Sequence, residues 1–148
     1  MSCSSSLVCI LILFALAISK NHARVPQPIP RLNFEVHIIK GYANGLISGT
    51  CSSPSHIFAA NFTLIHLDDQ HQWHFRVQMH TRAYFACLLH KDHNERKTFT
   101  VFDQAVDGLN RRCGRTGMCF WKLKEDGIYF AVDNVSYTRE FAWDRYSI

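Results

Sequence analysis

The chain has 148 residues, a formal charge of +4 and 47% hydrophobic residues, which excludes a low-complexity protein and fits one compact domain. The positive charge is too small to indicate nucleic-acid binding by itself, and we expect no nucleic-acid partner.

An uncharged apolar run at residues 7–18 opens the chain. It is too short to span a bilayer comfortably and small residues follow it, which is typical of a signal peptide cleaved after Ser19, with Ala23 as a second candidate end. A retained membrane anchor is the alternative. We therefore expect a secreted, extracellular protein with a signal peptide at 1–19, a proline-containing leader at 20–32 and a single domain at 33–148.

The rest of the chain shows strand-like alternation in short segments separated by turn residues. Residues 33–40 form the first predicted strand. Residues 73–80 alternate most clearly, which predicts inward-facing Trp73, Phe75, Val77 and Met79. Further strands are expected at 46–51, 57–67, 84–89 and 98–102, with 84–89 in a central position because it is apolar on both faces. Polar connections are expected at 90–97 and 103–112.

About eight short strands with no helical periodicity after the N-terminal run predict an all-β fold, a small antiparallel β-sandwich. Two sheets about 10 Å apart would also bury the many aromatic rings.

The clearest pairing signal is a hairpin around Asp126-Gly127, the dipeptide that most favours a type I′ turn. A two-residue turn there would pair Leu123 with Phe130 and Trp121 with Val132. These four apolar side chains would share one face, so the turn chemistry and the hydrophobic pattern agree.

Two of the six cysteines lie in the expected signal peptide, and four remain: Cys51, Cys87, Cys113 and Cys119. An even number in a secreted chain predicts two disulfides, with three pairings open. No pair has the two-residue spacing of zinc knuckles, so a zinc site is disfavoured.

These residues also carry a family resemblance. The four cysteines, Trp121 two residues after the last of them, and the sequence Asp126-Gly127-Ile128-Tyr129 form a fairly specific signature. On these landmarks, with the strand ending near Lys40 and the segment Phe85-Ala86-Cys87, the chain resembles the plant S-protein homologues, relatives of the stigmatic self-incompatibility proteins. The similarity covers nearly all of the chain after the expected signal peptide.

The resemblance implies a secreted, disulfide-stabilised, non-enzymatic β-sandwich. It would act as an extracellular signalling or recognition ligand for a cell-surface membrane protein, in pollen–pistil self-incompatibility or a related role. The alternative is a secreted defence or toxin-like protein that makes peripheral contact with anionic membranes or cell walls.

Nine histidines invite a search for enzymatic or metal chemistry. His71 and His74 are three residues apart, as are His90 and His93, a spacing that does not give a ready metal clamp on a strand or loop. The Gly-Leu-Trp-Pro context of secreted ribonucleases and a glycine-flanked serine nucleophile are both missing from the sequence. We therefore predict no enzyme activity, no metal and no cofactor.

Two sequons, Asn61-Phe62-Thr63 and Asn134-Val135-Ser136, are candidate N-glycosylation sites, and Asn134 is favoured by its place after the hairpin. Loops held by a rigid scaffold usually carry recognition residues, and simple solvation is the alternative for any one charge. The candidate partner-binding residues are Lys91, Arg96, Lys97, Arg111, Arg112 and Arg115.

Overall fold

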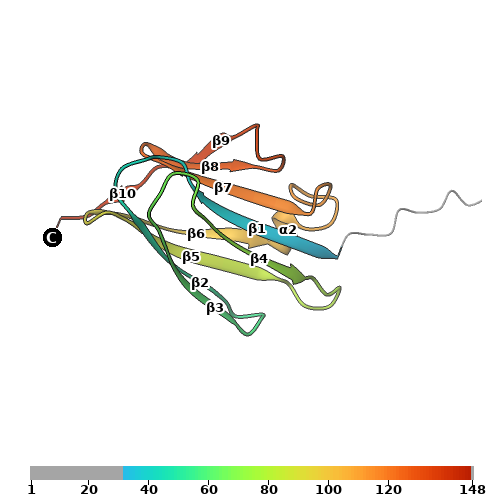
Figure 1. The fold of residues 1–148 in the computed structure, drawn as a ribbon. Coiled ribbons are helices and arrows are strands. Elements are labelled where there is room, and N and C mark those ends of the chain that lie inside the picture. Colours follow the sequence, from blue (N-terminus) through green and yellow to red (C-terminus); the bar gives the residue numbers. More distant parts are fainter. Residues whose placement is uncertain (1–31, 148) are drawn as a thin grey trace, which may run out of the picture.

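The computed structural model describes residues 32–147, which form two five-stranded sheets packed face to face (Figure 1). In spatial order the first sheet contains β4 (Gln70–Arg76), β1 (Asn33–Lys40), β7 (Met118–Lys124), β8 (Gly127–Ala131) and β9 (Thr138–Phe141). The second contains β10 (Asp144–Arg145), β6 (Glu95–Asp103), β5 (Tyr84–Lys91), β2 (Ile47–Ser53) and β3 (Phe58–Leu64). A four-residue helix, α2 (Gln104–Asp107), follows β6.

The predicted all-β sandwich is confirmed, with one departure from antiparallel pairing. β1 pairs with β7 in parallel, while every other pair of neighbouring strands among the described residues is antiparallel. Parallel neighbours need a long crossover, and here the crossover from β1 to β7 contains the strands β2 to β6. β5 lies between β6 and β2, which is the central position predicted for this segment.

The core lies between the two sheets and is rich in aromatic side chains. Phe34, Phe85, Phe102 and Trp121 are among its largest fully buried side chains. The indole Nε1 of Trp121 on β7 donates a hydrogen bond to the carbonyl oxygen of Val101 on β6 at 2.8 Å, so the two sheets are joined by a buried polar contact as well as by packing.

The hairpin between β7 and β8 corrects the predicted register by two residues. The turn is formed by Glu125 and Asp126, and Gly127 already pairs with Lys124. A shift of two residues leaves each side chain on its predicted face, because strand side chains alternate with a period of two. The observed pairs are Trp121 with Phe130 and Leu123 with Ile128.

Gly127 serves a different purpose from the predicted one. Its φ is not positive, so it does not supply a type I′ turn. A Cβ atom at this position would lie 2.5 Å from the carbonyl oxygen of Phe141, so glycine lets β9 approach β8 closely.

Two further predictions need correction. β4 ends at Arg76, and Met79, predicted to face inward, is 74% exposed in the connection to β5. The predicted polar loop at 90–97 is a hairpin whose turn covers residues 92–94 only, so Lys91 and Lys97 belong to strands.

The expected signal peptide and all of the leader except residue 32 lie outside the described residues. In the described part of the chain, no helix has the length and apolar character needed to cross a membrane.

Candidate functional site

The four cysteines form two disulfides, Cys51–Cys87 and Cys113–Cys119. Cys51 on β2 lies directly opposite Cys87 on β5, with their Cα atoms 4.1 Å apart, so this bridge reinforces the middle of the second sheet. The Cys113–Cys119 bridge instead closes the short loop that leads into β7. The prediction of two disulfides is thus fulfilled, and the tertiary structure selects the pairing.

The loop closed by Cys113 and Cys119 is held to its surroundings by the backbone. The amide of Cys113 donates to the carbonyl of Asp107 at 3.0 Å, and the amide of Gly117 donates to the carbonyl of Cys113 at 2.7 Å. Gly117 has a φ of 77°, a conformation that favours glycine, and its own carbonyl accepts from the amide of Glu35. We call this loop, together with residues 77–83 and 103–112, the disulfide-loop end of the sandwich.

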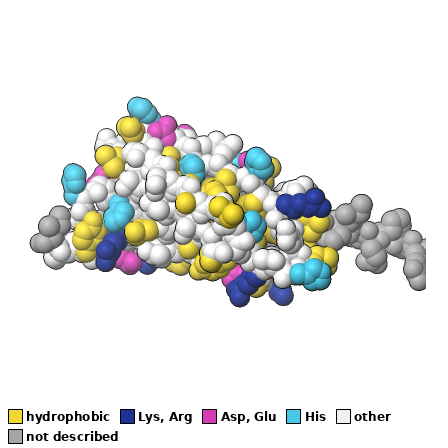
Figure 2. Space-filling view, turned by 90° about the horizontal axis from the view of Figure 1, so that it is seen from below, with side chains coloured by type: hydrophobic (Ala, Val, Ile, Leu, Met, Phe, Trp, Pro, Cys, Tyr) yellow, Lys and Arg dark blue, Asp and Glu magenta, His cyan; other side chains and the backbone are white. Residues whose placement is uncertain are grey.

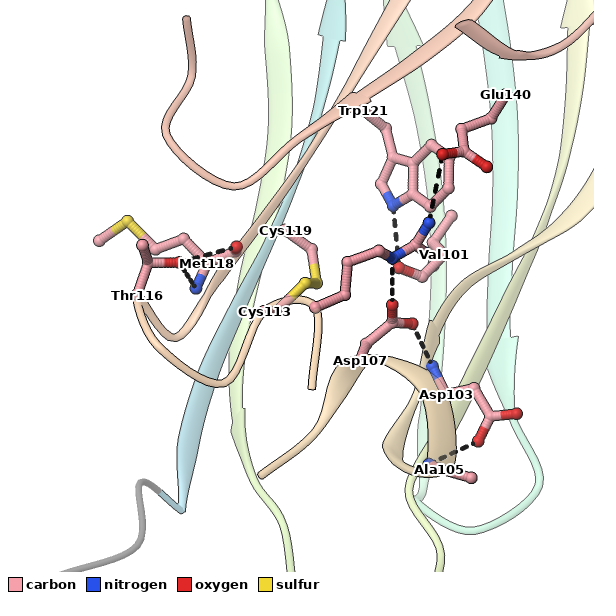
Figure 3. A network of polar contacts seen from close by, with 11 residues as sticks. Val101, Asp103, Ala105, Asp107, Cys113, Thr116, Met118, Cys119, Trp121 and Glu140 are labelled. Carbon is pink, nitrogen blue, oxygen red and sulfur yellow. Dashed lines mark hydrogen bonds and ion pairs between the residues drawn. A yellow bond between two sulfur atoms is a disulfide. The ribbon is translucent and has the colours of Figure 1, made fainter. Parts of the chain in front are cut away.

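A buried carboxylate organises the disulfide-loop end (Figure 3). Asp107, 1% exposed, accepts from Arg112 Nε at 2.7 Å and from the backbone amide of Asp103 at 2.8 Å. The guanidinium carbon of Arg112 lies 3.7 Å from the ring centroid of Phe130, and Arg112 Nη1 lies 3.4 Å from Glu140. Arg112, a candidate partner-binding residue, is therefore a structural cation that joins the α2 region to β8 and β9.

A second carboxylate of this end, Asp103, caps α2 by accepting from the amide of Ala105 at 3.0 Å. Arg82 donates to both oxygens of this carboxylate, from Nε to Oδ1 and from Nη2 to Oδ2, and these bonds hold the pKa of Asp103 below its usual value. The side chain of Arg82 is 63% exposed, whereas those of Asp103 and Asp107 are 13% and 2% exposed. At this end the acids lie beneath the surface and the arginines lie on it.

Beside this ion pair is an open groove of about 430 Å³ that combines cations with apolar walls. Arg82, Arg111 and His80 contribute the basic groups, and Met79 and Leu109 contribute apolar surface. On the right-hand side of Figure 2, Lys and Arg gather toward this end of the molecule. Such a surface suits an anionic partner that also carries apolar groups.

The other candidate basic residues have different positions. Arg111 and Arg115 are exposed at the disulfide-loop end. Arg96 is exposed at the opposite end, where its guanidinium lies over the Tyr146 ring, and Lys97 Nζ contacts Asp144 at 2.9 Å. The predicted set is thus divided between two ends of the sandwich and does not form one surface.

Lys91 is buried in the interior of that opposite end. It is 8% exposed, and its Nζ donates to Glu95 Oε2 at 2.6 Å and to the carbonyl of Glu125 at 2.7 Å. Nearby, the fully buried Lys40 donates to three backbone carbonyls and lies over the Tyr42 ring. Burial and neighbouring carboxylates raise the pKa of Tyr42. We call this region the lysine end.

Sequence reasoning did not single out Arg82 and His80 as candidate binding groups, although both line the groove. The signal was the polar run His80-Thr81-Arg82 directly after Met79, which is poor in strand-forming apolar residues and indicates that β4 stops earlier. It also missed the spacing of Asp103 and Asp107, which lets the Asp107 carboxylate accept from the backbone amide of Asp103 across α2.

Among the described residues, one group of three potential metal ligands lies close together. Asp107, Cys113 and Cys119 come close enough together to bind an ion, but the two sulfur atoms are bonded to each other and are not free thiolates. The ring of His71 stacks on Phe62 with centroids 4.4 Å apart, while His74 is exposed, so this pair is separated as predicted.

Both sequon asparagines are exposed. Asn61 lies at the centre of β3 and accepts from Thr50 Oγ1 at 2.9 Å. Asn134 has a φ of 59° in the connection between β8 and β9, and accepts from the Tyr137 hydroxyl at 2.5 Å.

Comparison with known families identifies one match. The model of plant self-incompatibility protein S1 matches residues 35–143, which spans both sheets and both disulfides. A comparison with curated protein sequences gives no match. The family match agrees with the signature of four cysteines, Trp121 and the following hairpin. The chain therefore belongs to the plant self-incompatibility protein S1 family.

Proposed function

We propose that this protein is a secreted recognition ligand that binds a cell-surface membrane protein through its disulfide-loop end. The family assignment supports an S-protein-like role, and two disulfides fit an oxidising extracellular compartment. The cell-surface partner and the use of the disulfide-loop end for binding are what we propose beyond the family assignment.

The arrangement of charge at the disulfide-loop end carries the proposal. Asp103 and Asp107 are buried and bonded to arginines, so they do not cancel the field of the exposed Arg111 and Arg115. The bridge between Cys113 and Cys119 holds Arg115 on a closed loop, which lowers the entropy lost when a partner immobilises it. An acidic surface on the partner would meet positioned cations beside an apolar groove.

Binding of labelled protein to intact pollen and vegetative plant cells tests this proposal. The double variant R111E/R115E should lower saturable binding by at least about tenfold, which corresponds to about 1.4 kcal/mol. Arg145, 84% exposed at the lysine end, supplies the matched control R145E, which should bind like the wild type. Equal loss in both variants would contradict a specific role for the disulfide-loop end.

A second candidate is direct contact with anionic membranes. The observation that favours it is exposed apolar surface at the same end, with Met79 74% and Val106 52% exposed. Binding to vesicles that contain phosphatidylserine, weakened by salt and lost in R111E/R115E, would support this candidate. Saturable, protease-sensitive binding to cells without vesicle binding would support the protein partner.

A further inference from the structure

β3 is the unprotected edge of the second sheet. Among the described strands its one hydrogen-bonded neighbour is β2, and it lies at the lower margin of the sandwich in Figure 1. Its residues, Phe-Ala-Ala-Asn-Phe-Thr-Leu, include no charged residue and no proline. An exposed edge of this composition is a template for pairing with another chain.

The other three sheet edges carry charges that oppose such pairing. β4 contains Arg76, and β9 contains Arg139 and Glu140. β10 has only two residues, Asp144 and Arg145, and both are charged. Charged side chains and short edge strands are devices by which natural proteins prevent edge-to-edge association.

β3 also lacks the irregularity that could turn its backbone away from a second copy. It pairs with β2 in unbroken register from Ser53 opposite Phe58 to Ile47 opposite Leu64. Its inner face is anchored where the Phe62 ring covers Gly49, since a Cβ on that glycine would lie 2.2 Å from the ring. The edge is therefore regular and fixed in position.

Asn61 stands at the centre of this edge and begins a sequon that ends at Thr63. Both residues are exposed and face outward. Thr50 Oγ1 on β2 donates to Asn61 Oδ1 at 2.9 Å, while Nδ2, the atom that carries an N-glycan, donates to no described residue. A shallow groove of about 410 Å³, lined by Thr50, Thr63 and His90 among others, gives room beside it for a first sugar.

We propose that Asn61 carries an N-linked glycan and that this glycan prevents β3 from pairing with β3 of a second copy. A bulky, hydrated oligosaccharide at the middle of the strand does what charged side chains do at the other three edges. This proposal rests on the passage through the secretory pathway that the proposed function includes.

The co-reactant is a polyprenyl-diphosphate-linked oligosaccharide of the secretory pathway. The amide Nδ2 of Asn61 forms a bond to C1 of the first sugar and loses one proton. The bond between C1 and the diphosphate oxygen breaks, and the polyprenyl diphosphate leaves with the electron pair of that bond. The reaction involves no oxidant or reductant.

The first test uses protein secreted from plant cells. Intact mass and peptide mapping should find the glycan on Asn61, and N61Q and T63A should lose it, whereas T63S should keep it. Both non-glycosylated variants should lose monomer to dimers and larger species in size-exclusion chromatography with light scattering. N134Q is the matched control, because Asn134 lies between β8 and β9 of the other sheet, and it should stay monomeric.

An unmodified Asn61 peptide in secreted protein, or N61Q that stays as monomeric as N134Q, would overturn the proposal and leave the cell-binding result untouched. Failure of secretion would contradict both proposals.

The second test is independent of secretion. Oxidised, refolded protein from bacteria carries no glycan, so the wild type should self-associate as its concentration rises. N61K places a charge at the centre of the edge and should restore the monomer, with N134K as the control that does not. Wild-type protein that stays monomeric in this form would contradict the role assigned to the glycan.

Discussion

The two ends of the sandwich bury charges of opposite sign and satisfy them in different ways. At the disulfide-loop end the buried charge is the Asp107 carboxylate, which is paired with a cation, Arg112, and a backbone amide. At the lysine end it is the Lys40 ammonium, whose described partners are the carbonyls of Tyr42, Ala43 and Asn44 and the Tyr42 ring.

The difference separates the exposed Arg111 and Arg115 of the disulfide-loop end from the buried lysines of the lysine end. An acid below the surface draws Arg112 inward, and the neighbouring Arg111 and Arg115 remain exposed. At the lysine end the buried groups are themselves the cations, and backbone dipoles satisfy much of their hydrogen-bonding capacity. Arg111 and Arg115 are therefore available to a partner, while the buried Lys40 and Lys91 stabilise loops.

The largest effect is expected from D107A. It removes the acceptor for Arg112 and for the buried amide of Asp103, which should lower the free energy of unfolding by about 3 kcal/mol. Chemical denaturation followed by tryptophan fluorescence would measure the change. Glu125, exposed in the β7–β8 turn, gives the control E125A, which should stay within about 0.5 kcal/mol of the wild type. Equal values for the two variants would show that the buried acid is not the organising group.

The variant C113S/C119S, which lacks the Cys113–Cys119 bridge, should lower the free energy of unfolding by about 2.4 kcal/mol in the chain-entropy model. The expected loss is modest because the closed loop is short. The same variant should weaken binding at the disulfide-loop end by freeing Arg115. T116A, inside the loop but outside the bridge, is the control for both measurements. A double serine variant with full cell binding would show that the loop does not position the arginine.

K40M tests the lysine end. It keeps the length and packing of the side chain but leaves three backbone carbonyls without their donor. The free energy of unfolding should therefore fall by about 2 kcal/mol. Cell binding should not change, because this end is remote from the proposed contact. K124M is the matched control, since that ammonium lies over Tyr129 on the sheet surface. If K40M folds but binds cells less well, this would contradict the assignment of binding to the disulfide-loop end and of loop stabilisation to the lysine end.

The smallest effect is expected from acidification. The pKa of Asp103 is depressed by Arg82, so the stability that this pair contributes is present above the unfolded pKa of about 4 and is lost as pH falls through the lower folded pKa. R82Q should therefore lose less stability than the wild type over this acid range. R111Q, at the same end, should follow the wild type. Denaturation midpoints measured from neutral pH to below pH 4 would compare the three proteins.

The sequence predicted much of the fold from local patterns. The bounds of β1 were predicted without error, as were the inward positions of Val77, Cys87 and Trp121, because alternation reports which face of a strand is apolar. Register is less local. The β7–β8 turn lies one residue earlier than predicted, which changes the pairing register by two, and Gly127 stands where β9 approaches, a contact that the hairpin sequence does not contain.

The candidate site was predicted only in part. Arg111 and Arg115 were placed correctly on exposed loops, but Lys91 is buried. It is buried because it continues the inward-facing positions of Cys87 and Leu89 on β5. The two-residue alternation along the strand could have predicted that Lys91 points inward. Arg112 could not be separated from its exposed neighbours in the same way, since its half-buried position depends on Asp107, Phe130 and Glu140 from three different elements.

By itself the sequence determined the all-β class, the sheet faces and the presence of two disulfides, because these follow from side-chain periodicity and cysteine count. Only the tertiary structure decided which cysteines pair, which cations are buried and where an uncharged edge lies open. Those outcomes depend on which strands become neighbours, and that choice is made by the packing of the whole sandwich.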